Sequence, residues 1–195
     1  INFSFTYLDD EFYKFTLSMF PQFLNTQKSI EILKFFLKPK NIKKQDLKIY
    51  ITRENADYRK IINEYDLVKM LKNDGYEIIN TNLYEIKDQI KIFSRAKKII
   101  SAYGSGLTNI VFSQPDTDIT VITPNLDKPY EEHLKNRYKM LAEYNKLNYI
   151  EVFADTIEIE NHSKNARNYI NNKILNESNN FKNLIVNLKD FKKYL

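Results

Sequence analysis

Cysteine is absent from this chain of 195 residues, and histidine occurs only twice, at His133 and His162. Without cysteine the protein can form no disulfide, no thiolate metal site and no thiol nucleophile. Two histidines are also too few for a metal centre built from imidazole ligands. We therefore expect no essential metal and no bound cofactor.

Long apolar runs are missing as well, and none could span a bilayer. We expect a cytoplasmic protein, with the inner face of the membrane as the alternative location. The formal net charge is +5, from 30 basic and 25 acidic side chains, but the basic residues are scattered along the chain. A nucleic-acid-binding protein gathers its lysines and arginines on one face, so we expect no nucleic-acid partner.

Three parts can be distinguished along the chain. Residues 1–44 are aromatic-rich and mostly helical in pattern, and they end in a basic linker around Pro39. Residues 45–154 alternate between short apolar runs and segments of helical period. Residues 155–195 form an Asn-rich tail whose last part, 181–195, carries apolar residues at helical spacing. We expect that last part to be one helix that packs back on the protein.

The middle part predicts a doubly wound, Rossmann-like α/β fold with a parallel sheet, because its strands alternate with helices. The predicted strands cover residues 47–52, 76–80, 98–102, 118–123 and 148–153. The predicted helices cover residues 57–73, 85–97, 107–112 and 130–145.

Glycine is scarce, and two of the 3 glycines, Gly104 and Gly106, flank Ser105 directly after a predicted strand. Ligands of open α/β sheets bind outside the carboxyl ends of the strands. A turn from strand to helix at that edge exposes backbone N–H groups at the positive end of the helix, which suits an anion. The alternative is a tight turn that packs helix on sheet without a ligand. The turn lacks the third glycine of a dinucleotide fingerprint and the lysine of a P-loop.

Arg53 ends the first predicted strand at the same edge of the sheet. Its guanidinium could meet a phosphate through two parallel hydrogen bonds, or it could pair at the surface with a neighbouring acid. Glu64 and Gln89 lie inside the apolar faces of their predicted helices. A carboxylate there needs a partner, so Glu64 either orients Arg53 or Arg59 in the site or reaches solvent at the helix end. For Gln89 we favour a buried amide that ties its helix to a neighbouring loop.

The sequence Asp116-Thr117-Asp118 matches the Asp-x-Asp pattern that carries metal in many nucleotide-sugar enzymes. Here it follows Pro115 and precedes a predicted strand. It should therefore lie at the amino edge of the sheet, away from the ligand crevice. We favour a turn with a solvated pair of charges.

Three blocks of residues, in order and at proper spacing, resemble glycosyltransferase family 61. The first block holds Arg53, Glu54, Asn55, Arg59, Asn63 and Glu64. The second holds Asp88, Gln89, Ile90, Phe93, Ala96, Ile99 and Ile100. The third holds Tyr103, Gly104, Ser105, Gly106, Leu107, Thr108, Asn109, Phe112 and Pro115. The resemblance covers about residues 47 to 125. Two family histidines are replaced, one by Tyr103 and one by Lys14.

The resemblance implies a GT-B fold of two facing Rossmann-like lobes, of which residues 45–154 would be the donor-binding lobe. Residues 1–44 would then be a remnant or part of the acceptor-side lobe. It also implies sugar transfer from a nucleotide sugar, usually a UDP-sugar, to a glycan acceptor, and bacterial members are associated with capsule or surface polysaccharide. The nucleotide-binding candidates are Tyr103, Gly104, Ser105, Gly106, Leu107, Thr108, Asn109, Arg59 and Gln89.

Catalysis would rest on Arg53, which stabilises the departing diphosphate, and on Glu64, which orients Arg53 or deprotonates the acceptor hydroxyl. Two other functions compete with this one: a non-catalytic nucleotide-binding or scaffold subunit of a polysaccharide assembly, and an unrelated Rossmann-like binding module. The lysines in residues 181–195 leave peripheral contact with an anionic membrane as an alternative to packing on the protein. The sequence does not indicate an oligomeric state.

Overall fold

A computed structural model describes residues 45–126, 136–160 and 178–195, with single positions 31, 34, 35, 37, 174 and 177 besides. The helices expected within residues 1–38 and the linker after them lie outside the described residues, apart from four of those single positions. Lys14 and the first part of the helix expected at 130–145 also lie outside them. No helix in the described part of the chain combines the length and apolar character that crossing a bilayer requires.

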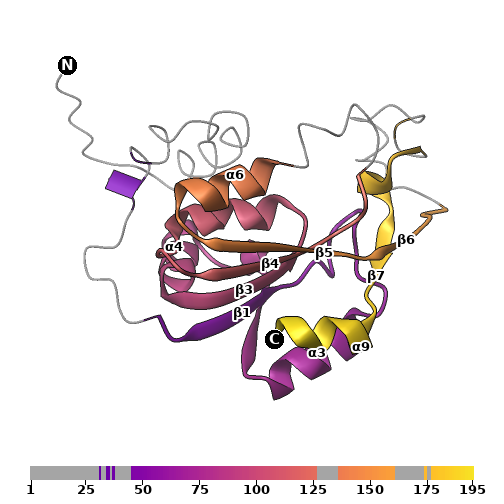
Figure 1. The fold of residues 1–195 in the computed structure, drawn as a ribbon, viewed down its shortest axis with the longest axis horizontal. Coiled ribbons are helices and arrows are strands. Elements are labelled where there is room, and N and C mark those ends of the chain that lie inside the picture. Colours follow the sequence, from indigo (N-terminus) through magenta and orange to yellow (C-terminus); the bar gives the residue numbers. More distant parts are fainter. Residues whose placement is uncertain are drawn as a thin grey trace.

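The centre of the molecule is a parallel sheet of five strands in the order β2-β1-β3-β4-β5 (Figure 1). The strands are β1 (Leu47–Ile51), β2 (Tyr76–Ile79), β3 (Ala96–Ala102), β4 (Asp118–Thr123) and β5 (Asn148–Phe153). All five predicted strands are present. The prediction of a Rossmann-like α/β fold with a parallel sheet is therefore confirmed.

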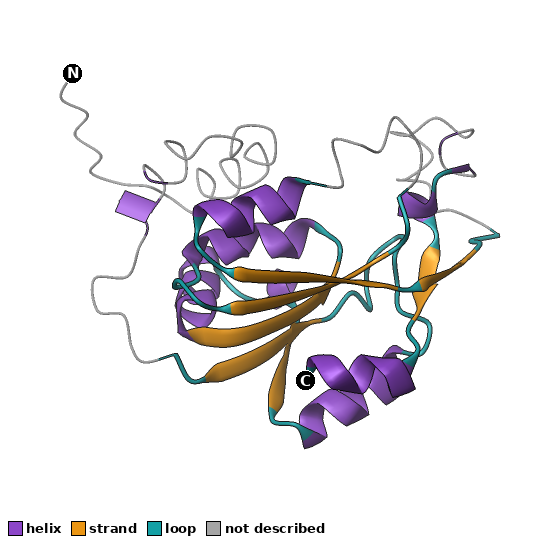
Figure 2. Ribbon diagram, viewed as in Figure 1, coloured by secondary structure: helices purple, strands orange, loops and turns teal. Residues whose placement is uncertain are grey.

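Helices cover both faces of the sheet, because side chains along each strand alternate between two apolar cores (Figure 2). Ile49 and Ile99 face α4 (Ile86–Arg95), the 3₁₀ helix η2 (Ser105–Phe112) and α6 (Arg137–Tyr144). Tyr50 and Ile100 face α3 (Glu64–Asn73) and the end of the chain. The first crossover lies on one face and the later ones on the other, which makes the fold doubly wound.

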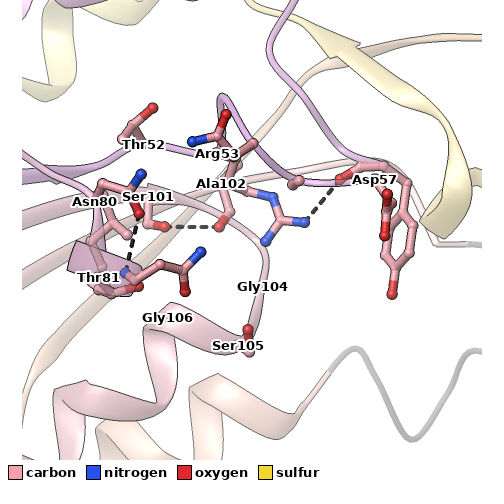
Figure 3. A pocket seen from close by; sticks show the side chains of 15 residues that line it. Thr52, Arg53, Asp57, Asn80, Thr81, Ser101, Ala102, Gly104, Ser105 and Gly106 are labelled. Atoms are coloured by element: carbon pink, nitrogen blue, oxygen red, sulfur yellow. Dashed lines mark hydrogen bonds between the residues drawn. The ribbon is translucent and has the colours of Figure 1, made fainter. Parts of the chain in front are cut away.

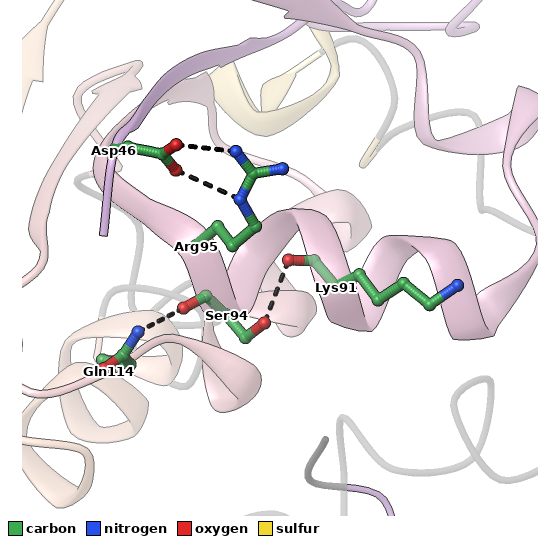
Figure 4. Close-up of polar contacts among 5 residues, drawn as sticks. All are labelled: Asp46, Lys91, Ser94, Arg95 and Gln114. Carbon is green, nitrogen blue, oxygen red and sulfur yellow. Dashed lines mark hydrogen bonds and ion pairs between the residues drawn. The ribbon is translucent and has the colours of Figure 1, made fainter. Parts of the chain in front are cut away.

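The junction between α4 and β3 has no loop, since the helix ends at Arg95 and the strand begins at Ala96. The helix predicted to reach residue 97 is therefore too long. Arg95 pairs with Asp46 just before β1, with distances of 3.1 Å and 2.7 Å from Nε and Nη2 (Figure 4). Gln114 donates to the backbone oxygen of Ser94 at 2.6 Å. These contacts join the amino ends of the strands, although an exposed ion pair contributes only about 0–1 kcal/mol.

The helix predicted from residue 57 begins only at Glu64, so that prediction is wrong at its start. Residues before it pair with the end of the chain: the amide of Arg59 donates to the oxygen of Lys182 at 3.0 Å, and Ile61 bridges to Leu184. Arg59 itself has a left-handed φ of 57°, which no α-helix accommodates. Contacts with a distant segment therefore override the local helical pattern.

The single helix predicted for residues 181–195 is also wrong. The chain instead forms η4 (Asn179–Phe181), β7 (Asn183–Ile185), α9 (Leu188–Phe191) and η5 (Lys192–Tyr194), and β7 runs antiparallel to β6 (Asp155–Ile157). Leu184 is buried while Ile185 is exposed, as in a strand. A new helix starts after Asn187, whose side chain accepts hydrogen bonds from the next turn. Phe191 is 1% exposed and packs in the core with Tyr50.

Candidate functional site

A cleft of about 230 Å³ opens at the carboxyl ends of β1, β2 and β3 (Figure 3). Its walls are formed by residues 51–53, 55–58, 80–82, 101, 102 and 104–106. From β1 the chain continues to β2 on one side of the sheet, and from β3 it continues to β4 on the other side. The cleft therefore lies at the point where the direction of the strand order reverses. That is the position at which open α/β sheets bind their ligands.

The Gly-Ser-Gly turn forms one wall of the cleft and leads from β3 into η2. Within the described residues, the N–H groups of Gly104, Ser105 and Gly106 donate to no acceptor. These N–H groups are the unpaired donors at the start of η2, a helix of eight residues. The start of a helix is its positive end. The turn can therefore accept an anion through its backbone.

Close approach of neighbouring side chains explains both glycines. A Cβ atom at Gly104 would collide with the guanidinium of Arg53, and one at Gly106 would lie 3.2 Å from Cγ2 of Ile51. A larger side chain at either position would fill the cleft. The backbone of the turn is thus exposed to a ligand by the absence of side chains.

Arg53 extends from the end of β1 into the cleft, where its guanidinium lies against Gly104. One terminal nitrogen donates to the oxygen of Tyr58 at 2.8 Å, while Nε is buried without a hydrogen-bond partner. Burial lowers the pKa of Arg53, while the nearby Tyr58 raises it by a smaller amount. A half-buried cation with an unused donor attracts an anionic ligand.

Glu64 does not line the cleft but fixes the end of β1 beneath it. Its Oε1 accepts three hydrogen bonds, from Tyr50 Oη at 2.6 Å, Thr52 Oγ1 at 2.9 Å and the amide of Arg53 at 3.2 Å. Glu64 thus contacts the backbone of Arg53 and not its guanidinium. Burial, followed by the charge of Glu64, raises the pKa of Tyr50 well above its ordinary value.

Arg59 lies behind the cleft and is 7% exposed. Its Nε donates to the oxygen of Tyr103 at 2.7 Å, and one terminal nitrogen donates to the backbone oxygen of Asn180 at 2.6 Å. The guanidinium also lies 4.7 Å from the ring centroid of Tyr58. Burial, followed by repulsion from Arg53, lowers the pKa of Arg59 to about 10. Its hydrogen bonds join the loop before α3, the turn after β3 and the C-terminal segment.

The remaining predicted residues support the turn from below. Gln89 donates to the oxygens of Thr81 and Tyr84 at 2.9 and 3.0 Å and accepts from Asn109 at 2.8 Å. Gln89 therefore ties α4 to the preceding loop as predicted, but its side chain is half-buried and not buried. Leu107 and Thr108 are buried in the layer of η2. The structure therefore brings Arg53, Gly104, Ser105 and Gly106 into the cleft, and leaves Glu64, Arg59, Gln89, Leu107, Thr108 and Asn109 outside its walls.

Tyr103 is buried beside the cleft, and its ring packs edge-on against Tyr138 at 4.9 Å between centroids. Asp57, which the sequence offered only as a possible surface partner of Arg53, also lines the cleft (Figure 3). Asp57 was included in the predicted helix. No local signal reveals its loop, because the loop is fixed by pairing with residues 182–184.

The Asp116-Thr117-Asp118 turn lies where β4 begins, at the opposite edge of the sheet from the cleft. Asp116 has a left-handed φ of 65°, and Asp118 accepts a hydrogen bond from Asn148 at 2.9 Å. Thr117 is fully buried and hydrogen-bonds to the oxygen of Ala96. The two carboxylates therefore belong to a turn remote from the cleft.

Comparison with known proteins identifies the family. The Glycosyltransferase 61 profile matches residues 10–120, a stretch that begins before β1 and contains all three walls of the cleft. No curated protein matches the chain. Because the profile covers more than half of the sequence and the whole of the cleft, the chain belongs to glycosyltransferase family 61, whose members transfer a sugar from a donor to an acceptor.

Proposed function

We propose that this chain transfers a sugar from a nucleotide sugar, a UDP-sugar, to a glycan acceptor in surface polysaccharide synthesis. The observation that carries the proposal is the half-buried guanidinium of Arg53, which lies against Gly104 and whose Nε has no hydrogen-bond partner among the described residues. The unpaired N–H groups of residues 104–106 adjoin it. A diphosphate matches this set of donors in charge and in hydrogen bonding.

In the reaction, the bond between the anomeric carbon and the diphosphate oxygen breaks while a bond to the acceptor oxygen forms. Negative charge builds up on the departing diphosphate. Arg53 and the backbone donors stand in place before the reaction and stabilise that charge as it develops. We propose that they do so without a metal ion, since a guanidinium and a helix end supply the positive charge.

The acceptor hydroxyl loses a proton as its oxygen attacks the sugar. Asp57 is the carboxylate among the described residues of the cleft wall, and we assign it the role of accepting that proton. Glu64 is unsuited to this role, because its Oε1 already accepts three hydrogen bonds. Glu64 instead holds the end of β1 so that Arg53 enters the cleft.

The five-stranded sheet fits the donor lobe of a GT-B enzyme, with residues 1–44 on the acceptor side. The location that we propose is the cytoplasm, at or near the inner face of the membrane where surface polysaccharides are assembled.

Calorimetry with UDP, uridine and pyrophosphate tests the donor site. Arg53→Ala should weaken UDP and pyrophosphate binding by about 1.5–3 kcal/mol, the range for charge-assisted hydrogen bonds, and should leave uridine binding nearly unchanged. Arg95→Ala is the matched control, because Arg95 lies at the opposite edge of the sheet and pairs with Asp46. Equal losses for UDP and uridine would make Arg53 a structural residue and would contradict the proposal.

A further inference from the structure

A second cavity, of about 310 Å³, lies beside the cleft at the carboxyl ends of β4 and β5. Tyr103 lines this cavity and Gly104 lines the cleft. Consecutive Cα atoms are only about 3.8 Å apart, so one peptide unit separates the two spaces. The two spaces are therefore neighbours at the same edge of the sheet.

The walls of the two spaces differ in the sign of their half-buried charge. In the cleft that charge is the guanidinium of Arg53, and in the second cavity it is the carboxylate of Glu151. Glu151 accepts a hydrogen bond from Tyr149 Oη at 3.0 Å and pairs with no cation in the described part of the chain. A carboxylate only accepts hydrogen bonds, so Glu151 suits the hydroxyl groups of a ligand.

Phe153 adds a flat apolar surface to the same cavity. Phe153 lies two residues after Glu151 on the same side of β5. Phe153 is 65% exposed, whereas Glu151 is half-buried. The amide of Asn136 and the exposed ammonium of Lys139, at the start of α6, also line the cavity. An aromatic ring beside a carboxylate and amide groups is the combination that accommodates a ring with an apolar face and a polar edge.

We propose that the second cavity is a subsite for a neutral sugar ring, whose adjacent hydroxyls donate to Glu151 while the ring packs against Phe153. Such a ring can come from two sources, the ribose of the nucleotide donor or a residue of the glycan acceptor. The inference rests on the proposed function, which puts the diphosphate in the neighbouring cleft. It extends that function by assigning the uncharged part of a substrate to residues outside the cleft.

Size supports a division of the substrate between the two spaces. Pockets for small ligands usually measure about 300–1,000 Å³, and the cleft, at about 230 Å³, is smaller than that. It can hold a diphosphate with an adjoining group, but a complete nucleotide sugar must extend into neighbouring space. The second cavity begins one residue away from the turn that would hold the diphosphate.

The first experiment separates ribose from the other source. Calorimetry compares UDP, 2′-deoxy-UDP and pyrophosphate on the wild type and on Glu151→Ala, with Glu151→Gln as a variant that keeps the side-chain volume. If the cavity holds ribose, the wild type binds UDP about tenfold more tightly than 2′-deoxy-UDP, both Glu151 variants lose that preference, and pyrophosphate affinity stays constant. Glu143→Gln removes the same charge from the exposed far end of α6 and should keep the preference.

The second experiment detects an acceptor ring. Saturation-transfer NMR measures binding of methyl glycosides of xylose, glucose, galactose and N-acetylglucosamine to the same variants, with and without UDP. If the cavity holds the acceptor, at least one glycoside binds the wild type and Glu143→Gln but loses its signal in both Glu151 variants. If neither the preference for UDP nor the binding of any glycoside changes in the Glu151 variants, the inference is overturned. Absence of UDP and pyrophosphate binding in the wild type would instead contradict the donor site, and the NMR comparison would still test the second cavity.

Discussion

The guanidinium of Arg59 donates from Nε to the oxygen of Tyr103 at 2.7 Å, on the peptide unit that carries the N–H of Gly104. A charge-assisted hydrogen bond to a carbonyl polarises the whole peptide unit and strengthens its N–H as a donor. Arg59 can therefore support anion binding at the turn without touching the anion. Its own position depends on Asn180, which accepts from Arg59 through both its backbone oxygen and its side chain.

Asn180→Ala should lower the free energy of unfolding by about 1.5–3 kcal/mol, because it leaves a buried guanidinium short of an acceptor. Urea unfolding followed by circular dichroism measures this change. Asn179→Ala is the matched control, since the neighbouring amide makes one exposed hydrogen bond to Asn125 and should cost much less. Equal effects of the two substitutions would show that Asn180 does not hold the buried cation.

Gly106→Val should abolish the binding of UDP and pyrophosphate while the protein stays folded. The new side chain would enter the cleft beside Ile51 and Thr81, where even a Cβ atom fits tightly. Gly75→Ala is the control, because Gly75 has a φ of 82° at the end of α3 and open space around it. That variant should lose about 1 kcal/mol of stability and bind UDP normally. Retention of UDP affinity in a folded Gly106→Val protein would show that the turn does not contact the diphosphate.

Asp57→Asn should separate binding from turnover. If Asp57 accepts the acceptor proton, kcat should fall about 100-fold or more. UDP affinity should stay the same or rise, because a negative charge leaves the cleft that holds the diphosphate. Asp66→Asn, on the exposed outer face of α3, is the control. An unchanged kcat in Asp57→Asn would assign the proton to another group.

Metal dependence provides a test at the other edge of the sheet. EDTA should leave UDP affinity unchanged, since Arg53 and the backbone donors supply the positive charge of the proposed site. Asp116→Asn together with Asp118→Asn should also be nearly neutral for binding, because both carboxylates lie at the start of β4. Loss of UDP binding on chelation, restored by Mg²⁺ or Mn²⁺, would reverse this view of the donor site.

Local sequence patterns were sufficient for the sheet and for the turn. Each strand contains a short apolar run, so its position is visible from nearby residues, although the start of β3 directly after α4 is not marked by a turn. Gly104 and Gly106 stand out because the chain has few other glycines. Their placement after β3 follows directly from the alternation of strands and helices.

The errors fall where distant segments pair. Residues 57–63 fit a helical period, but the backbones of Arg59, Lys60 and Ile62 hydrogen-bond to residues 182–184 instead. The same pairing turns residues 183–185 into a strand and divides the predicted C-terminal helix. Nothing near Arg59 in the sequence shows that its guanidinium donates to Asn180 and Tyr103, and its assignment to the nucleotide stays a prediction.

Alkaline pH should destabilise the protein, because five tyrosines titrate abnormally in the folded state: Tyr50, Tyr76, Tyr103, Tyr138 and Tyr149. Burial is the largest cause in each, and it raises the pKa above the ordinary value of 10.0. Above that pH the unfolded chain releases protons that the folded protein keeps, so stability falls as pH rises.

The arginines act in the opposite direction. Folding lowers the pKa of Arg59 to about 10, so above that pH the folded protein releases a proton that the unfolded chain keeps, and stability rises with pH. Arg53 has the same sign. Five tyrosines outweigh two arginines, so the free energy of unfolding should decrease with rising pH. The decrease should be about 1.4 kcal/mol per pH unit for each net proton. Urea unfolding between about pH 8 and pH 11, with absorbance at the tyrosinate band, measures it. Stability that stays constant or rises over this range would show that the tyrosines ionise without unfolding.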